Sequence, residues 1–325
     1  MAKVLVIGGA GYIGSHVCKL LTKKGHTVQI FDDLSTGFRS LAKFGTFTQG
    51  SLLNRKEIDA VVEKFQPEAV MHFAARAAVG ESVVNPALYY EQNIVGTFNL
   101  VESLRKFSPK AKFIFSSTCA VYGEVTEAIT EKTSTNPVNP YGRTKRMIEE
   151  MLADYDRAYG LKSVCLRYFN AAGADRDGEL GELHDPETHL IPRLLLKCKN
   201  PSTAEEVKIF GNDYPTPDGT CIRDYIHVED LATAHEKAMD YLLKGGSSER
   251  YNLGSTHGSS VMEVLAMVEK ITGVKLQIPV APRRPGDPAR LVASSSKFQK
   301  QFSWSLQHNL QSIVESAWKW TKAQS

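Results

Sequence analysis

Short apolar segments alternate with longer amphipathic segments through the first half of the chain. The apolar runs are rich in β-branched and aromatic residues, and the segments between them repeat apolar residues at helical spacing. The predicted strands cover residues 4–8, 27–31, 69–73, 112–117 and 163–169, and the predicted helices cover residues 12–25, 54–65, 86–107 and 140–160. This alternation predicts right-handed crossovers and an α/β fold with a Rossmann-like, doubly wound parallel sheet.

Two helix starts carry capping signals. Asn54 precedes one amphipathic segment, and Asn139 followed by Pro140 precedes another. An Asn side chain can accept a hydrogen bond from a free backbone N–H group, and proline suits the first helical position. We therefore expect both asparagines to act as N-caps.

The regular alternation stops near residue 170, where Pro, Gly and Asp become frequent. We predict a first domain at 1–168 and a smaller, loop-rich C-terminal domain at 169–325 that binds the substrate. Part of 226–253 is expected to pack back on the first domain.

Composition narrows the classes of function. The 325 residues are 42% hydrophobic and 23% charged, as in an ordinary soluble globular protein, and no apolar run approaches the roughly 18 to 20 residues of a membrane span. The net charge of +3 is dispersed along the chain, which argues against a nucleic-acid or membrane partner. The five cysteines form no C-x-x-C pair and the histidines form no H-E-x-x-H, so we predict a cytoplasmic protein without a metal.

A glycine-rich turn follows the first predicted strand. Its sequence GGAGYIGSH places Gly8, Gly11 and Gly14 where a tight turn brings a pyrophosphate to a helix N-terminus. Asp32 ends the next strand 18 residues beyond Gly14, where a carboxylate can bind adenosine ribose hydroxyls and repel a 2′-phosphate. These features predict NAD, although an ordinary strand-to-loop turn would also explain Asp32 and Asp33.

Tyr141 and Lys145 lie four positions apart in the helix predicted at 140–160, so they share a face. An ammonium about 4 Å from a phenol favours the phenolate by roughly 4 kcal/mol at an effective dielectric near 20, or about three pKa units. We therefore predict a tyrosine whose pKa is lowered toward neutrality, as a general base requires. With 12 tyrosines in the chain, about one Tyr-x-x-x-Lys is expected by chance, so the pair is informative only together with other motifs.

Thr118 follows the strand predicted at 112–117 and places a hydroxyl at the carboxyl end of the sheet, where such residues also simply cap strands. The order of glycine turn, Asp32, Thr118, Tyr141 and Lys145 resembles the extended short-chain dehydrogenase/reductase family. The resemblance implies that Lys145 and the nicotinamide charge lower the pKa of Tyr141, that Lys145 holds the nicotinamide ribose, and that Thr118 orients the substrate hydroxyl.

The second half of the chain is similar to the nucleotide-sugar epimerases of this family. The similar stretches are RYFNAAGA, HLIP, IFGNDYPTPDGTCIRDYIHVEDLA, YNLGS and APRRPGDPARLVAS, of which the run from GNDYP to RDYIH is the most specific. The resemblance covers nearly the whole chain. It implies interconversion of UDP-glucose and UDP-galactose by transient NAD-dependent oxidation at C4, rotation of the 4-keto sugar and return of the hydride.

The resemblance also implies the site residues. The cofactor residues are Gly8, Gly11, Tyr12, Ile13, Gly14, Asp32, Asp33, Ser51, Leu52, Phe73, Ala74, Ala75, Lys145 and Phe169. The substrate residues are Thr118, Tyr141, Asn170, Leu190, Arg223, Tyr225, Arg284, Asp287 and Leu291. The arginines suit a diphosphate because their planar guanidinium groups bind phosphate oxygens in pairs, although each is also compatible with a solvated surface charge.

Two positions depart from the family pattern. Ser51 stands where an aspartate usually contacts the adenine amino group, and Ala77, beside Arg76, stands where some members have a lysine. Ser51 can still accept a hydrogen bond. Whether Arg76 replaces that lysine stays open.

Other activities within the same family remain as alternatives. Nucleotide-sugar dehydratases and UDP-glucuronate decarboxylases carry acids directly after the threonine, where this chain has Cys119 and Ala120. An NAD-dependent dehydrogenase, a protein that only senses NAD, and an epimerase for UDP-N-acetylglucosamine or another UDP-sugar stay open. Leu291 takes the position that gates the C2 substituent in related epimerases.

A homodimer is expected through the helices at 86–107 and 140–160, which form the interface in similar proteins. The apolar residues expected to supply this surface are Tyr89, Leu100, Leu104, Ile148, Leu152 and Tyr155. Packing of the same residues in the core of one chain would produce the same spacing.

Overall fold

The computed structural model describes residues 1–125, 128–202, 206–284 and 287–324. The chain forms two compact units: unit 1 is Met1–Gly123, Glu131–Arg167 and Ala232–Asn252, and unit 2 is Glu124–Thr130, Tyr168–Leu231 and Leu253–Ser325. The short segment Glu124–Thr130 groups with unit 2, where Ile129 forms a bridge with Ala293. The predicted binding roles of the two domains stay predictions.

Unit 1 is built on a parallel sheet in the strand order β11-β6-β5-β4-β1-β2-β3. The strands are β1 Lys3–Ile7, β2 Thr27–Asp32, β3 Thr46–Gln49, β4 Ala69–His72, β5 Lys112–Thr118, β6 Ser163–Tyr168 and β11 Glu249–Asn252. Both β2 and β4 pair with β1, so the chain reverses its direction of winding between them. This order confirms the predicted doubly wound sheet, and β3 and β11 extend it beyond the five predicted strands.

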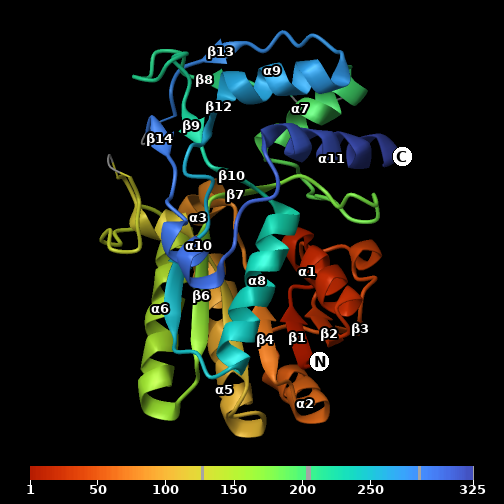
Figure 1. Ribbon diagram of the computed structural model, residues 1–325, viewed down its shortest axis with the longest axis vertical. Helices are drawn as coiled ribbons and strands as arrows, with labels where there is room; N and C mark the ends of the chain where they lie inside the picture. The colour runs from red at the N-terminus through yellow and green to blue at the C-terminus, as the bar shows by residue number, and fades with distance from the viewer. Residues whose placement is uncertain (126–127, 203–205, 285–286, 325) are drawn as a thin grey trace. The chain divides into compact units, whose positions relative to one another are not determined.

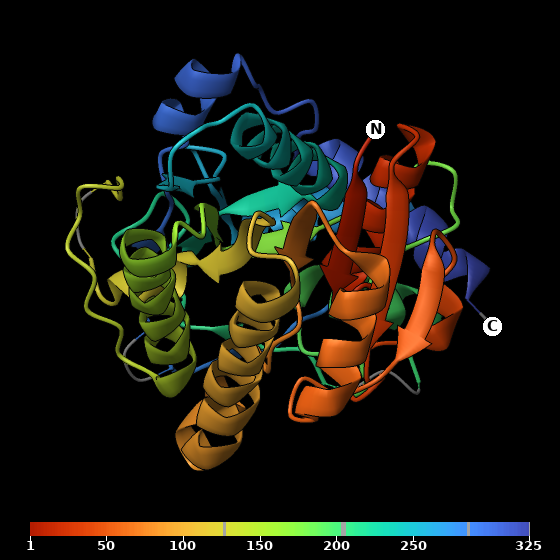
Figure 2. The same cartoon turned by 90° about the horizontal axis from the view of Figure 1, so that it is seen from below.

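Helices cover both faces of this sheet (Figure 1, Figure 2). The helices of unit 1 are α1 Tyr12–Lys23, α2 Arg55–Phe65, α3 Val79–Val84, α4 Pro86–Tyr89, α5 Gly96–Phe107, α6 Pro140–Tyr159 and the greater part of α8 Val228–Leu243. One core cluster joins apolar residues of α2, α5 and α6 to the sheet residues Leu5, Phe113 and Phe115. On the other face, Lys24 at the end of α1 pairs with Glu236 of α8, their charged atoms 2.6 Å apart.

The helix predicted at 86–107 is interrupted by a π-helical turn at Tyr90–Val95. Within it, the Asn93 side chain accepts a hydrogen bond from the Arg76 N–H at 2.8 Å and donates to the Arg76 carbonyl and the Thr144 hydroxyl at 3.1 Å. Asn93 is buried, and these contacts tie the loop after β4 to α6. Such turns often occur at functional sites.

The two predicted caps have different outcomes. The Asn139 side chain accepts the Gly142 N–H at 2.8 Å, and Pro140 opens α6, as predicted. Asn54 precedes α2, but its side chain donates to Glu57 Oε1 at 2.7 Å and accepts no backbone N–H. The predicted Asn54 cap is therefore wrong, because the side-chain amide is oriented toward the Glu57 carboxylate instead of toward the free N–H groups of α2.

In its described residues, unit 2 contains short strands and helices, three of which pack together. Its elements are β7 Asn170–Ala172, β8 Ile209–Phe210, β9 Ile222–Arg223, β10 Tyr225–His227, β12 Ser259–Ser260, β13 Val280–Ala281, β14 Arg290–Leu291, α7 Leu190–Lys199, α9 Val261–Thr272, α10 Ser296–Phe302 and α11 Leu310–Ala323. Apolar residues of α7, α9 and α11 form one core. The strands form sheets of two or three, as expected for a smaller, loop-rich domain. Pro285 and Gly286 of the APRRPGDP motif lie outside the described residues.

The apolar residues predicted to form the dimer surface are not exposed, so that prediction is wrong. Tyr89, Leu100, Leu104, Ile148 and Leu152 are buried in unit 1, and Tyr155 packs half-buried against the same core. The apolar stripe of these helices therefore faces the sheet. Exposed apolar side chains on the same two stretches include Val95, Phe98 and Met147. None of the helices in the described residues combines the length and apolar character that a membrane span requires.

Candidate active site

The glycine-rich turn between β1 and α1 has almost no free volume. Gly8 has a φ of +81°, and a Cβ there would lie 2.5 Å from the Ala74 nitrogen. A Cβ on Gly14 would lie 2.2 Å from the Gly8 carbonyl oxygen. The Gly11 N–H donates to that carbonyl at 3.2 Å, and α1 begins at Tyr12. Only glycines allow this approach, which brings the first N–H groups of α1 to the carboxyl end of β1.

Asp32 lies at the end of β2 and is buried. One carboxylate oxygen accepts the Ala10 N–H and the other accepts the Leu34 N–H, both at 2.9 Å. Burial raises the pKa of this carboxyl, while the two N–H donors act to lower it. Asp32 thus holds the glycine-rich turn in place, and each oxygen keeps a lone pair for a ligand hydroxyl. Asp33 is half-buried and accepts the Ser35 N–H at 2.8 Å.

The other predicted cofactor residues of unit 1 lie in the loops after β3 and β4 or at the start of α1. Phe73 and Ala74 follow β4, and their N–H groups donate to the Ile7 carbonyl at 2.8 and 3.2 Å. The Ser51 hydroxyl accepts the Leu53 N–H at 3.2 Å, which leaves a second lone pair for a ligand. The remaining predicted residues differ in exposure: Tyr12 and Leu52 are buried, whereas Ile13 and Ala75 are half-buried.

Tyr141 is the second residue of α6, and its phenol is hydrogen-bonded to the Thr118 side chain. Thr118 ends β5, and its hydroxyl also accepts the Ala120 N–H at 3.1 Å. The structure therefore brings together a phenol and a hydroxyl that are 23 positions apart in sequence, at the carboxyl end of the sheet.

The predicted lowering of the Tyr141 pKa is wrong for this arrangement. Burial raises the pKa of the phenol to about 12, and the Thr118 hydrogen bond only partly opposes that effect. The Lys145 Nζ atom lies 5.9 Å from the centre of the Tyr141 ring and donates to the Ser116 carbonyl at 2.8 Å. The i, i+4 spacing gave the correct shared face, but the ammonium is directed to a backbone acceptor.

Lys145 is itself buried, and burial lowers its pKa to about 7 despite the opposing charge of Glu149. Its Nζ also lies 4.8 Å from the centre of the Phe115 ring. A lysine with this pKa changes its charge near neutral pH, which is a common property of functional lysines.

Sequence reasoning missed the charged pair that lies behind Lys145. Glu149 is one helical turn further along α6, and both its side chain and that of Arg167 are at most 5% exposed. The two are joined by two hydrogen bonds, one of them 2.9 Å from Arg167 Nε, and Glu149 also accepts the Ser117 hydroxyl at 2.5 Å. Arg167 donates to the Tyr122 hydroxyl at 2.8 Å. This network fixes α6 to the ends of β5 and β6.

Unit 2 pairs two of the predicted substrate residues with each other. The Nη2 atom of Arg223 contacts the Asp287 carboxylate. The Nη1 atom of Arg223 donates to the carbonyls of Ile222 and Pro288 at 2.8 and 3.0 Å. Because the two charges already neutralise each other, an anionic ligand at Arg223 must compete with Asp287.

Asp224, which sequence reasoning did not select, organises the surroundings of this pair. It is buried, and its carboxylate accepts the N–H groups of Ser255 and Ala293 at 2.7 and 3.0 Å. Its backbone carbonyl accepts the Asn170 side-chain amide at 2.8 Å. Its place inside the RDYIH motif was the only sequence signal.

The remaining predicted substrate residues are distributed over unit 2. Tyr225 pairs with Asn170 between β10 and β7, and Leu291 pairs with Arg223 between β14 and β9. Arg284 is exposed, with its guanidinium 3.9 Å from the centre of the Phe210 ring. Phe169 is half-buried beside β7, and the half-buried Leu190 begins α7.

Comparisons with known proteins agree with one another. A family model described as the NAD dependent epimerase/dehydratase family matches residues 4–254. A UDP-glucose 4-epimerase of Rhizobium meliloti is 46% identical over 318 residues, which cover 98% of this chain and 96% of that protein. The structure of UDP-glucose 4-epimerase from Brucella ovis in complex with NAD has a TM-score of 0.93 and 47% identity, and covers 98% of each chain. The structure of the UDP-Glc/GlcNAc 4-epimerase from Campylobacter jejuni has a TM-score of 0.86 and 40% identity, and covers 99% of each chain.

The doubly wound sheet, the glycine-rich turn and the Tyr-Lys pair beside Thr118 define an extended short-chain dehydrogenase/reductase. More particularly, the chain belongs to the NAD dependent epimerase/dehydratase family. The resemblance predicted from sequence, which is to the UDP-glucose 4-epimerases within it, is confirmed.

Removing the charge of Glu149 should destabilise unit 1 strongly. Glu149→Gln leaves the buried Arg167 guanidinium without its counter-charge, and breaking such a pair costs about 3 to 5 kcal/mol. The adjacent Glu150→Gln is the matched control, since the Glu150 side chain is 55% exposed and its pair with Arg146 should contribute about 0 to 1 kcal/mol. Urea unfolding followed by circular dichroism measures both variants. Equal midpoints for the two would show that the network contributes little.

Proposed function

We propose that this protein interconverts UDP-glucose and UDP-galactose by a transient oxidation at C4 of the sugar, with NAD as its cofactor. The observation that carries the proposal is the hydrogen-bonded Tyr141–Thr118 pair beside the buried Lys145, at the carboxyl edge of the sheet. Relatives also support the proposal, because proteins named UDP-glucose 4-epimerase align with this chain over nearly its whole length.

The glycine-rich turn fits a dinucleotide. The close packing of Gly8 and Gly14 leaves the N-terminus of α1 accessible to a pyrophosphate, and Asp32 offers carboxylate oxygens to the adenosine ribose. Ser51 offers a hydroxyl to the adenine, and Lys145 offers an ammonium to the nicotinamide ribose. NAD bound there would supply the hydride acceptor and donor for C4 of the sugar, and its oxidised nicotinamide ring would carry a positive charge.

The chain's own residues transfer the proton of the C4 hydroxyl. Tyr141 takes the proton of the C4 hydroxyl and returns it after the sugar has rotated, while Thr118 orients that hydroxyl. Because burial raises the pKa of Tyr141 to about 12, ionisation requires positive charge beside the phenol. The Lys145 ammonium contributes to this positive charge. Glu149 acts to raise the pKa of Lys145 and so favours its charged form.

Unit 2 supplies the proposed contacts to the nucleotide sugar. Arg223 and Arg284 bind the diphosphate, and Asp287 binds the uridine ribose once the ligand has displaced its contact with Arg223. Asn170, Leu190 and Tyr225 frame the sugar pocket, and Phe169 lies beside the nicotinamide. These roles rest on the positions that the chain shares with related epimerases.

A dehydratase or decarboxylase is disfavoured because the residues after Thr118 are the apolar Cys119 and Ala120, which cannot supply an acid for elimination. A second candidate activity is the epimerisation of UDP-N-acetylglucosamine. It is favoured by Leu291 at the gate position and by the likeness to an epimerase named for both Glc and GlcNAc substrates. A homodimer in the cytoplasm stays a prediction, and the exposed apolar residues proposed for its interface include Val95, Phe98 and Met147.

The purified protein should convert UDP-galactose to UDP-glucose without added reductant and should carry NAD through gel filtration, because the net redox change is zero. Chromatography of the nucleotide sugars and the absorbance of NADH measure both outcomes. Accumulation of NADH or of a keto-deoxy sugar, with no epimer formed, would replace the proposal by a dehydrogenase or a dehydratase.

Tyr141→Phe should lower kcat by about 10² to 10⁴-fold with little change in KM, since a positioned acid-base group typically contributes that much. Tyr159→Phe, in the last position of α6, is the control because Tyr159 is 57% exposed. Steady-state kinetics with UDP-galactose compare the two variants with the parent. Full activity of Tyr141→Phe would remove this phenol from the mechanism.

Leu291 should make UDP-N-acetylglucosamine a weak substrate. Overpacking a site costs about 1 to 3 kcal/mol, so kcat/KM should favour the plain hexoses by roughly 5- to 150-fold. Leu291→Tyr should abolish the N-acetyl activity and spare UDP-glucose, whereas Leu291→Cys should raise it. If neither substitution changes the ratio of kcat/KM values, specificity is set elsewhere.

A further inference from the structure

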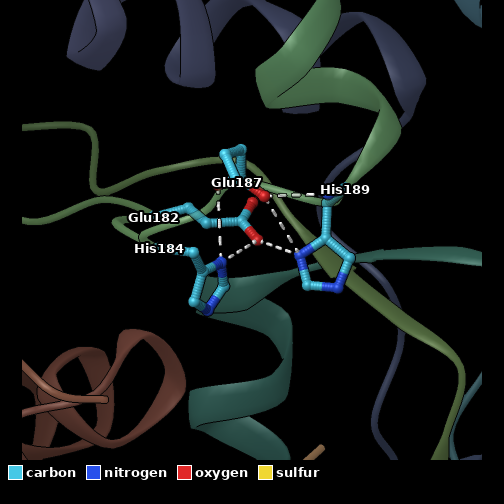
Figure 3. Close-up of side chains that lie close together, drawn as sticks. All are labelled: Glu182, His184, Glu187 and His189. Atoms are coloured by element: carbon cyan, nitrogen blue, oxygen red, sulfur yellow. Dashed lines mark hydrogen bonds and ion pairs between the residues drawn. The ribbon is translucent and has the colours of Figure 1, made fainter. Parts of the chain in front are cut away.

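The loop between β7 and α7 gathers two glutamates and two histidines within eight positions. Glu182, His184, Glu187 and His189 point toward one another, and each offers one ligand atom within 4.8 Å of the others (Figure 3). The loop lies wholly in unit 2 and outside the residues proposed to act in catalysis.

The spacing of these atoms suits a tetrahedral cation. With metal bonds of about 2.0 to 2.2 Å to nitrogen and oxygen, the ligand atoms of a tetrahedral Zn²⁺ site are roughly 3.3 to 3.5 Å apart. His184 Nδ1 lies 3.3 Å from Glu182 Oε1 and 3.4 Å from Glu187 Oε2. His189 Nδ1 lies 3.7 Å from Glu187 Oε1 and 2.5 Å from Glu182 Oε1. The last of these pairs, a hydrogen bond, has to open by about 1 Å to admit a cation at the bond lengths above.

The cluster requires positive charge at its centre. The side chains of Glu182 and Glu187 are only 6% and 10% exposed, and two buried carboxylates need a counter-charge. Protonated histidines are one source, because both imidazoles lie against these carboxylates. A divalent cation is the other source, and it would displace those protons.

The backbone of the loop holds these ligands in place. The Trp320 indole N–H donates to the Glu182 carbonyl at 3.0 Å, and a Cβ on Gly181 would lie 2.3 Å from the Trp320 ring. The Glu187 carboxylate accepts the N–H groups of Thr188 and His189 at 2.7 and 2.8 Å. The cluster is thus anchored to α11 and to the start of α7, as a preorganised site requires.

The two other polar clusters of this kind in the described residues are poorer sites. In the first, formed by His227, Glu229 and His308, the Arg176 guanidinium lies 3.0 Å from Glu229 and 3.1 Å from His308, so a cation would meet a like charge. The second contains only the acids Asp175, Asp177 and Glu179, and offers no imidazole.

We propose that Glu182, His184, Glu187 and His189 bind one Zn²⁺ ion. Two imidazole nitrogens and two carboxylate oxygens form a ligand set that suits zinc among the common divalent ions. Because the protein supplies four ligands, the site is structural, and the ion ties the loop to the first turn of α7. The proposal replaces the sequence expectation of no metal and does not rest on the proposed function.

Metal titration of the full chain without a histidine tag tests the proposal. After treatment with a chelator, Zn²⁺ is added in competition with a chromophoric chelator, and one equivalent should bind. His184→Gln and His189→Gln should each weaken binding by more than about 100-fold, since loss of even an outer-shell partner costs about 10- to 100-fold. His257→Gln is the matched control, because His257 is an exposed histidine elsewhere in unit 2.

Two further measurements use the unmodified chain and do not depend on the folding of a variant. Co²⁺ should give the strong visible absorption of a tetrahedral site, and Zn²⁺ should raise the melting temperature. The same Zn²⁺ addition should leave the melting temperature of His184→Gln unchanged. Absence of saturable binding, or equal affinity in the parent and both histidine variants, would show that protons alone balance these carboxylates.

Discussion

The burial of the Lys145 ammonium is the constraint on which the arrangement of unit 1 depends. An ammonium removed from water loses hydration, so its charge has to be supported by acceptors and nearby anions. The Ser116 carbonyl supplies the direct hydrogen bond, and Glu149 supplies the negative charge one helical turn away. Glu149 is in turn held by Arg167 and Ser117. The proposed active site is therefore tied to the core through one continuous polar network.

The same principle operates at Asp32 and Asp224, two buried carboxylates that accept backbone N–H groups. Each joins segments that are far apart in sequence: Asp32 joins β2 to the glycine-rich turn, and Asp224 joins β9 to the segments at Ser255 and Ala293. A buried carboxylate that accepts backbone N–H groups restricts loop conformation, because leaving such groups unpaired in the interior is costly. In both units, loops proposed to bind ligands are thus positioned from the protein interior.

Family membership defines a reaction type more closely than it defines a sugar. In the proposed mechanism, the phenol, hydroxyl and ammonium of unit 1 act on the hydroxyl presented to them, and the residues proposed to select among UDP-sugars lie in unit 2. The relevant groups in unit 2 are the half-buried Leu291 on the two-residue strand β14 and the pair of Arg223 with Asp287. Under this proposal, changes in these contacts would alter specificity without altering the catalytic groups.

The sequence by itself determined the five inner strands, the glycine-rich turn and the shared face of Tyr141 and Lys145, because these follow from local periodicity and from residue types at short spacing. Only the tertiary structure decided the rest. The pKa of Tyr141 depends on burial, which local spacing does not report, and the interaction of Glu149 with Arg167 joins two separate elements. The expected dimer surface, from Leu100 to Leu152, is core for the same reason: an apolar stripe shows that a helix face is buried, but only the packing of the chain shows what covers it.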